Sequence, residues 1–177
     1  MEFNPQSNET TGYHLFLMPK GSVAEELQQT INQLAEEYNG PIFPPHVTLL
    51  ARIPEGDETL VIQKARELAS VMQPIPLSLG ELQSEDSYFK ALYSAVHEQE
   101  EMRALHEKAC AVFGMQPDSA YEAHLSLLYG NYPEEHKAQT RAHHSVSHEP
   151  FVVTELHVFR TKGTVEEWVE IEAVPFG

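Results

Sequence analysis

The spacing of apolar residues predicts five secondary-structure elements in the first half of the chain. A short buried strand over 13–18 precedes a helix whose apolar residues recur every three or four positions as far as Tyr38. Ser22 and Glu25 have the S-x-x-E spacing of a capping box at the start of this helix. Further on, the pattern predicts a strand over 46–51, a helix over 58–72 and a strand over 75–82.

The second half of the chain follows a similar pattern. It predicts a strand over 88–97, a helix over 98–113 that ends at Gly114, a strand over 123–129, a short helix over 133–144, and a hairpin of strands over 151–160 and 165–174.

The two halves share the order strand, helix, strand, helix, strand. Tyr13 precedes His46 by 33 residues, and Tyr88 precedes His124 by 36. We therefore expect an internal duplication and an α+β fold, with two mainly antiparallel sheets facing a central cleft and the helices outside. We expect the whole chain, 1–177, to form a single bilobal domain: one lobe covers about 13–83, the other about 88–177, and 1–12 is a flexible N-terminal segment.

The composition fits one globular domain of 177 residues, because 41% of the residues are apolar and 21% are charged. The charge balance is unusual. Eleven lysines and arginines stand against 27 acidic residues, so the net charge is −16. Such a field disfavours DNA, long RNA and anionic lipid surfaces, but it leaves room for a small anionic ligand.

The cysteine content and the N-terminal sequence indicate a reducing compartment. Cys110 is the single cysteine and has no intramolecular partner, and the first dozen residues lack the features of a signal peptide. Apolar runs stay shorter than the roughly 18 residues that span a bilayer. We expect a soluble cytoplasmic protein with no membrane association, and a monomer, since nothing in the sequence demands a partner chain.

Two short motifs carry the candidate chemistry. His46 and Thr48 in HVT, and His124 and Ser126 in HLS, occupy the same place in the two repeats. Residues two apart on a strand point the same way, so each strand presents an imidazole beside a hydroxyl. Two imidazoles can serve as general base and general acid near neutral pH, and hydroxyls can donate to a phosphate oxygen. Such a pair can open a phosphodiester without a metal ion.

These motifs resemble those of the two-histidine (2H) phosphoesterases. PHVTLL and HLSLLY match the paired motifs of that family, and the 78 residues from His46 to His124 are typical of it. The resemblance is greatest to plant and yeast cyclic phosphodiesterases, through LFLMP, YNGPIFPPHVT, SYFKALY and TVEEW in the same order. It implies hydrolysis of ADP-ribose 1″,2″-cyclic phosphate and of nucleoside 2′,3′-cyclic phosphates to monophosphates, with no cofactor.

The resemblance also implies roles for individual residues. His124 corresponds to the base that activates water and His46 to the acid for the leaving oxygen, although the symmetry permits the reverse. Thr48 and Ser126 would hold the non-bridging phosphate oxygens. Tyr129 matches a tyrosine that helps to place the water or the phosphate; packing as a core aromatic is the alternative.

Two phenylalanines match positions where plant relatives place aromatics that flank the nucleotide base. These are Phe16 and Phe89, and core packing is the better interpretation for each taken alone. Trp168 is interpreted as a core residue or part of the cleft wall. The histidines of a predicted helix and the loop after it lack the spacing of a metal motif, and we interpret them as solvated: His136, His143, His144 and His148.

Two other functions compete with this interpretation. An RNA 2′,3′-cyclic phosphodiesterase of the tRNA-ligase type would need a basic rim, but Arg52 is the one basic residue near HVT, and HLSLLYG has none. A non-catalytic nucleotide-binding module would keep the histidines for packing. Turnover of a cyclic nucleotide in EDTA discriminates between catalysis and binding, and the physiological substrate stays open.

Overall fold

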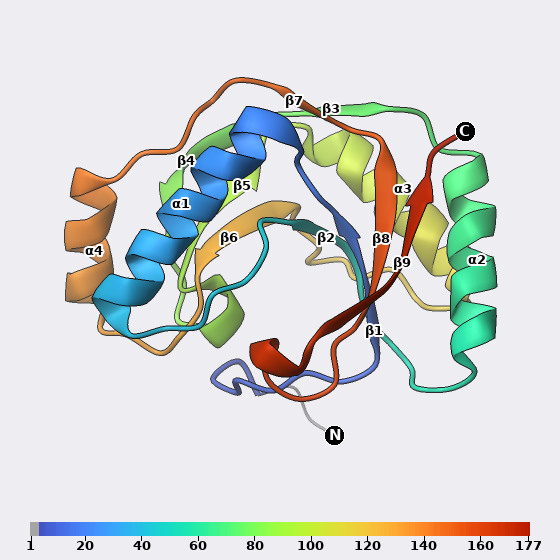
Figure 1. Cartoon of the computed structure of the whole chain (residues 1–177), viewed down its shortest axis with the longest axis horizontal. Helices are drawn as coiled ribbons and strands as arrows, with labels where there is room; N and C mark the ends of the chain where they lie inside the picture. The colour runs from blue at the N-terminus through green and yellow to red at the C-terminus, as the bar shows by residue number, and fades with distance from the viewer. Residues whose placement is uncertain (1–3) are drawn as a thin grey trace.

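The computed structural model describes residues 4–177 and has the predicted α+β class (Figure 1). The strands are β1 (Tyr13–Leu17), β2 (Val47–Ile53), β3 (Ile75–Leu77), β4 (Leu79–Gln83), β5 (Leu92–Val96), β6 (His124–Leu128), β7 (Phe151–Val153), β8 (Glu155–Arg160) and β9 (Val169–Pro175). The α-helices are α1 (Gly21–Tyr38), α2 (Glu58–Ser70), α3 (Gln99–Phe113) and α4 (Glu134–His143), and η1 (Tyr88–Lys90) and η2 (Val165–Glu167) are single 3₁₀ turns.

Seven strands form one antiparallel sheet in the order β4-β5-β6-β2-β1-β8-β9, and β3 pairs with β7 in a separate ribbon. The centre of the large sheet is the contact between β2 and β6, where Val47 pairs with Leu125. The two sheets predicted from the sequence are therefore joined edge to edge. Figure 1 shows α1 and α4 on the left of the view and α2 and α3 on the right, with β1 and β2 near the middle.

The two repeats exchange their last strands. β4, from the first repeat, pairs with β5 of the second, and β8, from the second repeat, pairs with β1 of the first. The helices cross as well, since α1 packs against β6 and α3 against β2. The predicted lobes over 13–83 and 88–177 are therefore not the units found in space. Each spatial half combines segments from both repeats, which ties the duplicated units together without a linker.

Four predicted strands are interrupted. The segment 75–82 divides at Ser78, whose main-chain N–H and hydroxyl donate to the Glu98 carboxylate at 2.9 and 2.8 Å, so the chain leaves one sheet for the other. The segment 151–160 divides at Thr154, between β7 in the ribbon and β8 in the large sheet. The segments 88–97 and 165–174 each begin with a 3₁₀ turn, η1 and η2.

The predicted capping box at the start of α1 does not form. The N-cap is Lys20, which makes no side-chain capping hydrogen bond, so Ser22 lies inside the helix. A capping box occurs instead at η2, between Thr164 and Glu167. Gly114 ends α3 in the left-handed conformation with φ of 70°, as the sequence predicts.

The central strands bury one face against the helices. Leu17, Val47 and Leu125 pair across β1, β2 and β6 and are fully buried. Burial of these aliphatic side chains is the main driving force that holds α1 and α3 to the sheet. The opposite face carries the polar residues of both motifs, because side chains alternate along a strand.

The N-terminal segment makes more contacts than its expected flexibility suggests. The main-chain N–H of Tyr88 donates to the Pro5 carbonyl at 2.8 Å, Asn131 donates to the Gln6 carbonyl at 2.9 Å, and Thr10 bridges to Gly163. Residues 1–3, part of the same prediction, lie outside the described residues. Within 4–177, no helix has both the length and the apolar character needed to cross a bilayer.

Candidate active site

The contact between β2 and β6 brings the two motifs together. With Val47 opposite Leu125 in an antiparallel register, His46 lies opposite Ser126 and Thr48 lies opposite His124. All four side chains therefore project from the face that the helices do not cover. Each imidazole is placed beside the hydroxyl of the other repeat, so the pseudo-symmetry of the chain produces a shared site.

Both imidazoles are held in the same tautomer. Nδ1 of His46 lies 2.7 Å from the carbonyl oxygen of Pro44, and Nδ1 of His124 lies 2.9 Å from that of Glu122. A carbonyl oxygen only accepts, so Nδ1 must carry the hydrogen in each ring. Nε2 is then left with a lone pair in both neutral histidines. Each is ready to take a proton, and each donates one when charged.

His46 is enclosed by aromatic side chains. Its ring stacks on Phe16 with centroids 3.8 Å apart, meets Phe43 and Trp168 edge-on, and is 5% exposed. Burial lowers the pKa of His46 to about 4, against the raising effect of the hydrogen bond to the Pro44 carbonyl, and His124 lowers it further. The Tyr129 hydroxyl lies 3.3 Å from Nε2. His46 is therefore a neutral imidazole in the resting protein.

His124 has a more polar environment. Its ring meets Tyr93 edge-on with centroids 5.4 Å apart. Burial lowers the pKa of His124, the hydrogen bond to the Glu122 carbonyl raises it, the Lys90 ammonium lowers it, and the carboxylates of Glu122 and Glu85 raise it. The two equivalent histidines thus differ in their charged neighbours.

The hydroxyls of the two motifs have different surroundings. Ser126 is 5% exposed, and its hydroxyl donates to the Phe89 carbonyl at 2.8 Å. Thr48 is half-buried, and its main-chain carbonyl accepts from the Tyr121 hydroxyl at 3.0 Å. To donate to a phosphate, Ser126 must first release its bond to Phe89. The phosphate-binding role of both hydroxyls stays a prediction.

The aromatic candidates separate into a buried and an accessible group. Phe16 is fully buried between His46 and Phe159, so it packs the core and offers no open ring face to a nucleotide base. Phe89 is partly buried and lies nearly parallel to Trp168, with centroids 5.9 Å apart. Trp168 also contacts the rings of His46 and Tyr129, so it is a wall of the site.

Three neighbours of the site were not predicted from the sequence. Lys90 and Tyr93 lie beside His124, and the sequence signal for them is their position in the SYFKALY segment. His14 is buried in β1, and burial lowers its pKa to about 3, with His46 and Arg52 acting in the same direction. Nε2 of His14 and Nε1 of Trp168 are both buried without a hydrogen-bond partner among residues 4–177.

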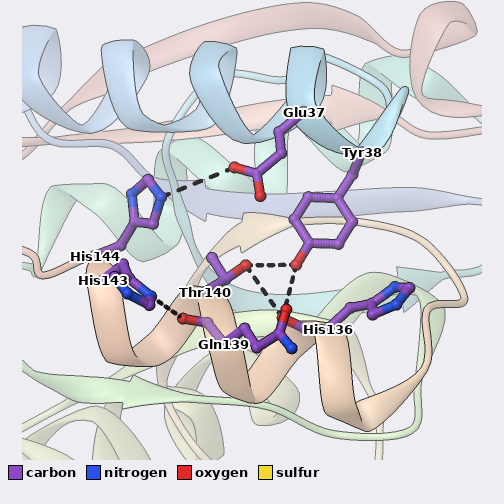
Figure 2. A pocket seen from close by; sticks show the side chains of 7 residues that line it. All are labelled: Glu37, Tyr38, His136, Gln139, Thr140, His143 and His144. Atoms are coloured by element: carbon purple, nitrogen blue, oxygen red, sulfur yellow. Dashed lines mark hydrogen bonds and ion pairs between the residues drawn. The ribbon is translucent and has the colours of Figure 1, made fainter.

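A separate surface pocket of about 400 Å³ lies between the end of α1 and α4 (Figure 2). The Tyr38 hydroxyl bonds to the Thr140 hydroxyl there, and the His144 ring lies 3.9 Å from the Glu37 carboxylate. In the described part of the chain, no three His, Cys, Asp or Glu side chains group as metal ligands, and this holds for the histidine-rich segment too.

The fold and the paired histidines define a two-histidine phosphoesterase. A family model described as "cyclic phosphodiesterase-like protein" matches residues 11–176, so the chain belongs to that family and is a hydrolase of phosphodiester bonds. The resemblance seen in the sequence is thereby confirmed. No curated protein sequence matches the chain closely enough to count as a relative.

Solved structures share the fold at low sequence identity. The protein TT0787 of Thermus thermophilus superposes with a TM-score of 0.61 at 14% identity, over 93% of this chain and 97% of its own. Escherichia coli LigT complexed with phosphate gives 0.60 at 11% identity, over 95% and 98%. The LigT complex with 3′-AMP gives 0.58 at 12% identity, over 94% and 98%. These likenesses extend over nearly the whole chain and concern the fold alone.

Proposed function

We propose that this protein hydrolyses small cyclic phosphodiesters by acid–base catalysis between His46 and His124, without a metal ion. The observation that carries the proposal is the equivalent fixation of both rings, each with Nδ1 bonded to a carbonyl so that Nε2 is the nitrogen that can take or give a proton. Two such rings on adjacent strands of one sheet face fit the transfer of one proton from water and another to a leaving oxygen.

The reaction needs one neutral and one charged imidazole. The neutral Nε2 takes a proton from water as its oxygen attacks phosphorus, the bond from phosphorus to one ring oxygen breaks, and the imidazolium protonates that oxygen. The product is a phosphomonoester with a free hydroxyl. Thr48 and Ser126 donate to the non-bridging oxygens as charge develops on them.

The surroundings of the histidines favour His46 as the base and His124 as the acid. Tyr129 donates to Nε2 of His46, which stabilises the unprotonated ring, and the pKa of His46 of about 4 keeps it neutral. Burial lowers the pKa of His124 as well, but the carboxylates of Glu122 and Glu85 act in the opposite direction and have no counterpart beside His46 among residues 4–177. This order is the reverse of the one that the family resemblance implies, and the dependence of the rate on pH tests it.

The substrates we propose are nucleoside 2′,3′-cyclic phosphates and ADP-ribose 1″,2″-cyclic phosphate. The net charge of −16 disfavours a polynucleotide, whereas a cyclic phosphodiester brings a single charge to the imidazoles. E. coli LigT has been solved with phosphate and with 3′-AMP, which are small ligands of the same kind. Phe89 and Trp168 would contact the base. We propose further that the protein acts as a cytoplasmic monomer.

Purified protein incubated with nucleoside 2′,3′-cyclic monophosphates in excess EDTA tests the proposal. We expect turnover to a monophosphate at an undiminished rate, and chromatography of the product identifies which ring oxygen was released. ADP-ribose 1″,2″-cyclic phosphate is assayed in parallel. Absence of turnover with every substrate between pH 4 and 9, or its loss in EDTA, would refute the proposal.

A further inference from the structure

Lys90 is a largely buried ammonium group beside the candidate active site. It ends η1, and its side chain is 16% exposed. Nζ lies 2.6 Å from Oε1 of Glu85, 2.7 Å from Oε2 of Glu122 and 4.2 Å from the centroid of the Tyr93 ring. Burial lowers the pKa of Lys90, but its bonds to Glu122 and Glu85 outweigh burial and hold the pKa above its ordinary value. The side chain is therefore a fixed positive charge.

Two partners of Lys90 are also neighbours of His124. Glu122 supplies the carbonyl oxygen that accepts from Nδ1 of His124 at 2.9 Å, and its carboxylate bonds to Lys90. Tyr93 meets the His124 ring edge-on and donates its hydroxyl to Oε1 of Glu85 at 3.1 Å. Lys90 thus contacts both Glu122, which orients the His124 ring, and Tyr93, which packs against that ring.

Within residues 4–177, five titratable groups surround the His124 ring. Lys90 is positive, Glu85 and Glu122 are negative, Tyr93 is a neutral phenol whose pKa is raised by burial, and His46 is the neutral ring across the strand contact. Without Lys90, the negative charges of Glu85 and Glu122 would have no compensating positive charge beside the imidazole and near an anionic substrate. His46 contacts aromatic rings and the Tyr129 hydroxyl, which carry no charge.

We propose that Lys90 is a positioning residue that holds Glu122 and Tyr93 against His124 and, with its charge, sets the proton affinity of that ring. The proposal deepens the proposed function, since it concerns the proton donor of the same site. It also accounts for the difference between two histidines that the duplicated sequence makes equivalent.

The direct test is an NMR titration of the His124 ring, which requires no turnover. The His124 signal is assigned by its loss in His124→Gln, and its titration midpoint is compared in wild type, Lys90→Gln and Lys90→Arg. We expect Lys90→Gln to raise the midpoint by about one pH unit, because two uncompensated carboxylates favour the imidazolium. Lys90→Arg keeps the charge and should keep the midpoint.

Lys20→Gln is the matched control. It removes a lysine that pairs with Glu155 at 2.6 Å, away from His124, and should leave the midpoint unchanged. Glu122→Gln provides a second arm if Lys90→Gln fails to fold: it removes a negative charge, keeps the main-chain carbonyl, and should lower the midpoint. An unchanged His124 midpoint in folded Lys90→Gln, or in Glu122→Gln, would overturn the proposal.

Kinetics separate this proposal from the function on which it rests. In active protein, Lys90→Gln should move the alkaline limb of the pH profile of kcat/KM upward by the same amount as the NMR midpoint. If wild type hydrolyses no cyclic phosphate but Lys90→Gln raises the His124 midpoint, the proposed function is refuted and the role of Lys90 is supported. If wild type is active but Lys90→Gln leaves the His124 midpoint unchanged, only the role of Lys90 is refuted.

Discussion

The hydroxyl of Tyr129 lies 3.3 Å from Nε2 of His46. Burial raises the pKa of Tyr129, so the phenol stays protonated and can donate to the imidazole lone pair. The Tyr129 ring is fixed by stacking on Phe43, with centroids 3.7 Å apart. Tyr129 therefore packs against the core and also contacts His46, while its role in placing the water or the phosphate stays a prediction.

Replacement of Tyr129 by phenylalanine separates these two roles. Tyr129→Phe keeps the stack on Phe43 and removes the donor that stabilises the unprotonated form of His46, so we expect at most a small loss of melting temperature and an acidic limb of the kcat/KM profile that moves to higher pH. Tyr38→Phe is the control, because that hydroxyl bonds to Thr140 at the distant pocket. An unchanged acidic limb in Tyr129→Phe would show that the contact with His46 does not affect the proton affinity of that ring.

The pH dependence of kcat/KM tests the assignment of acid and base. Burial lowers the pKa of both histidines below the ordinary 6.5, so the bell-shaped optimum should lie on the acidic side of pH 6.5. The pH profile of the residual activity of His46→Ala should lack the acidic limb, because the base is missing. The profile of His124→Ala should lack the alkaline limb, because the acid is missing. The opposite assignment of limbs would restore the order implied by the family.

Buried neutral histidines also make stability depend on pH. The pKa of His14 is about 3 and that of His46 about 4 in the folded protein, both lowered mainly by burial, against about 6.5 in the unfolded chain. Below pH 6.5 the unfolded chain binds more protons, so stability is lost as the pH falls toward 4.

A substitution of His14 checks this relationship. We expect the melting temperature of His14→Leu to fall less between pH 7 and pH 5 than that of wild type, because one of the two groups no longer titrates. His143→Leu removes an exposed histidine and should keep the wild-type slope. An equal slope in His14→Leu would mean that this ring is not buried as a neutral group.

The acidic charge of the protein should affect substrate binding. With a net charge of −16 and with Glu85 and Glu122 near His124, an anionic substrate approaches against a repulsive field. We expect KM to fall as NaCl rises from low concentration to about 0.15 M, where the Debye length is about 8 Å. A KM independent of salt would mean that the acidic residues do not repel the substrate as it binds.

Local patterns were sufficient to predict most elements and the two motifs. The period of the apolar residues predicted α1, α2 and α3 to within a few residues, and alternation placed His46 and Thr48 on one strand face. The pairing of Val47 with Leu125 then brought both motifs together, as a duplicated chain with a shared cleft requires.

The remaining features depend on contacts between distant segments. The division of strands at Ser78 needs the Glu98 carboxylate, and the exchange of β4 and β8 between repeats depends on which sheet edge each can reach. The SYFKALY segment marks the position of Lys90 but does not predict its ion pairs, because its partners Glu85 and Glu122 meet it only in the folded chain. The full burial of Phe16 likewise follows from packing by Phe159 of β8.

The most direct test of the account is the rate of hydrolysis of a nucleoside 2′,3′-cyclic monophosphate, in EDTA, by His46→Ala, His124→Ala and the control His143→Ala. Each catalytic variant should fold and lose about a hundredfold or more in kcat, since general acid–base catalysis contributes about 10²–10⁴-fold, while the control keeps the wild-type rate. Near-wild-type turnover in either His46→Ala or His124→Ala would contradict the central claim that these two histidines are the general base and the general acid of the reaction.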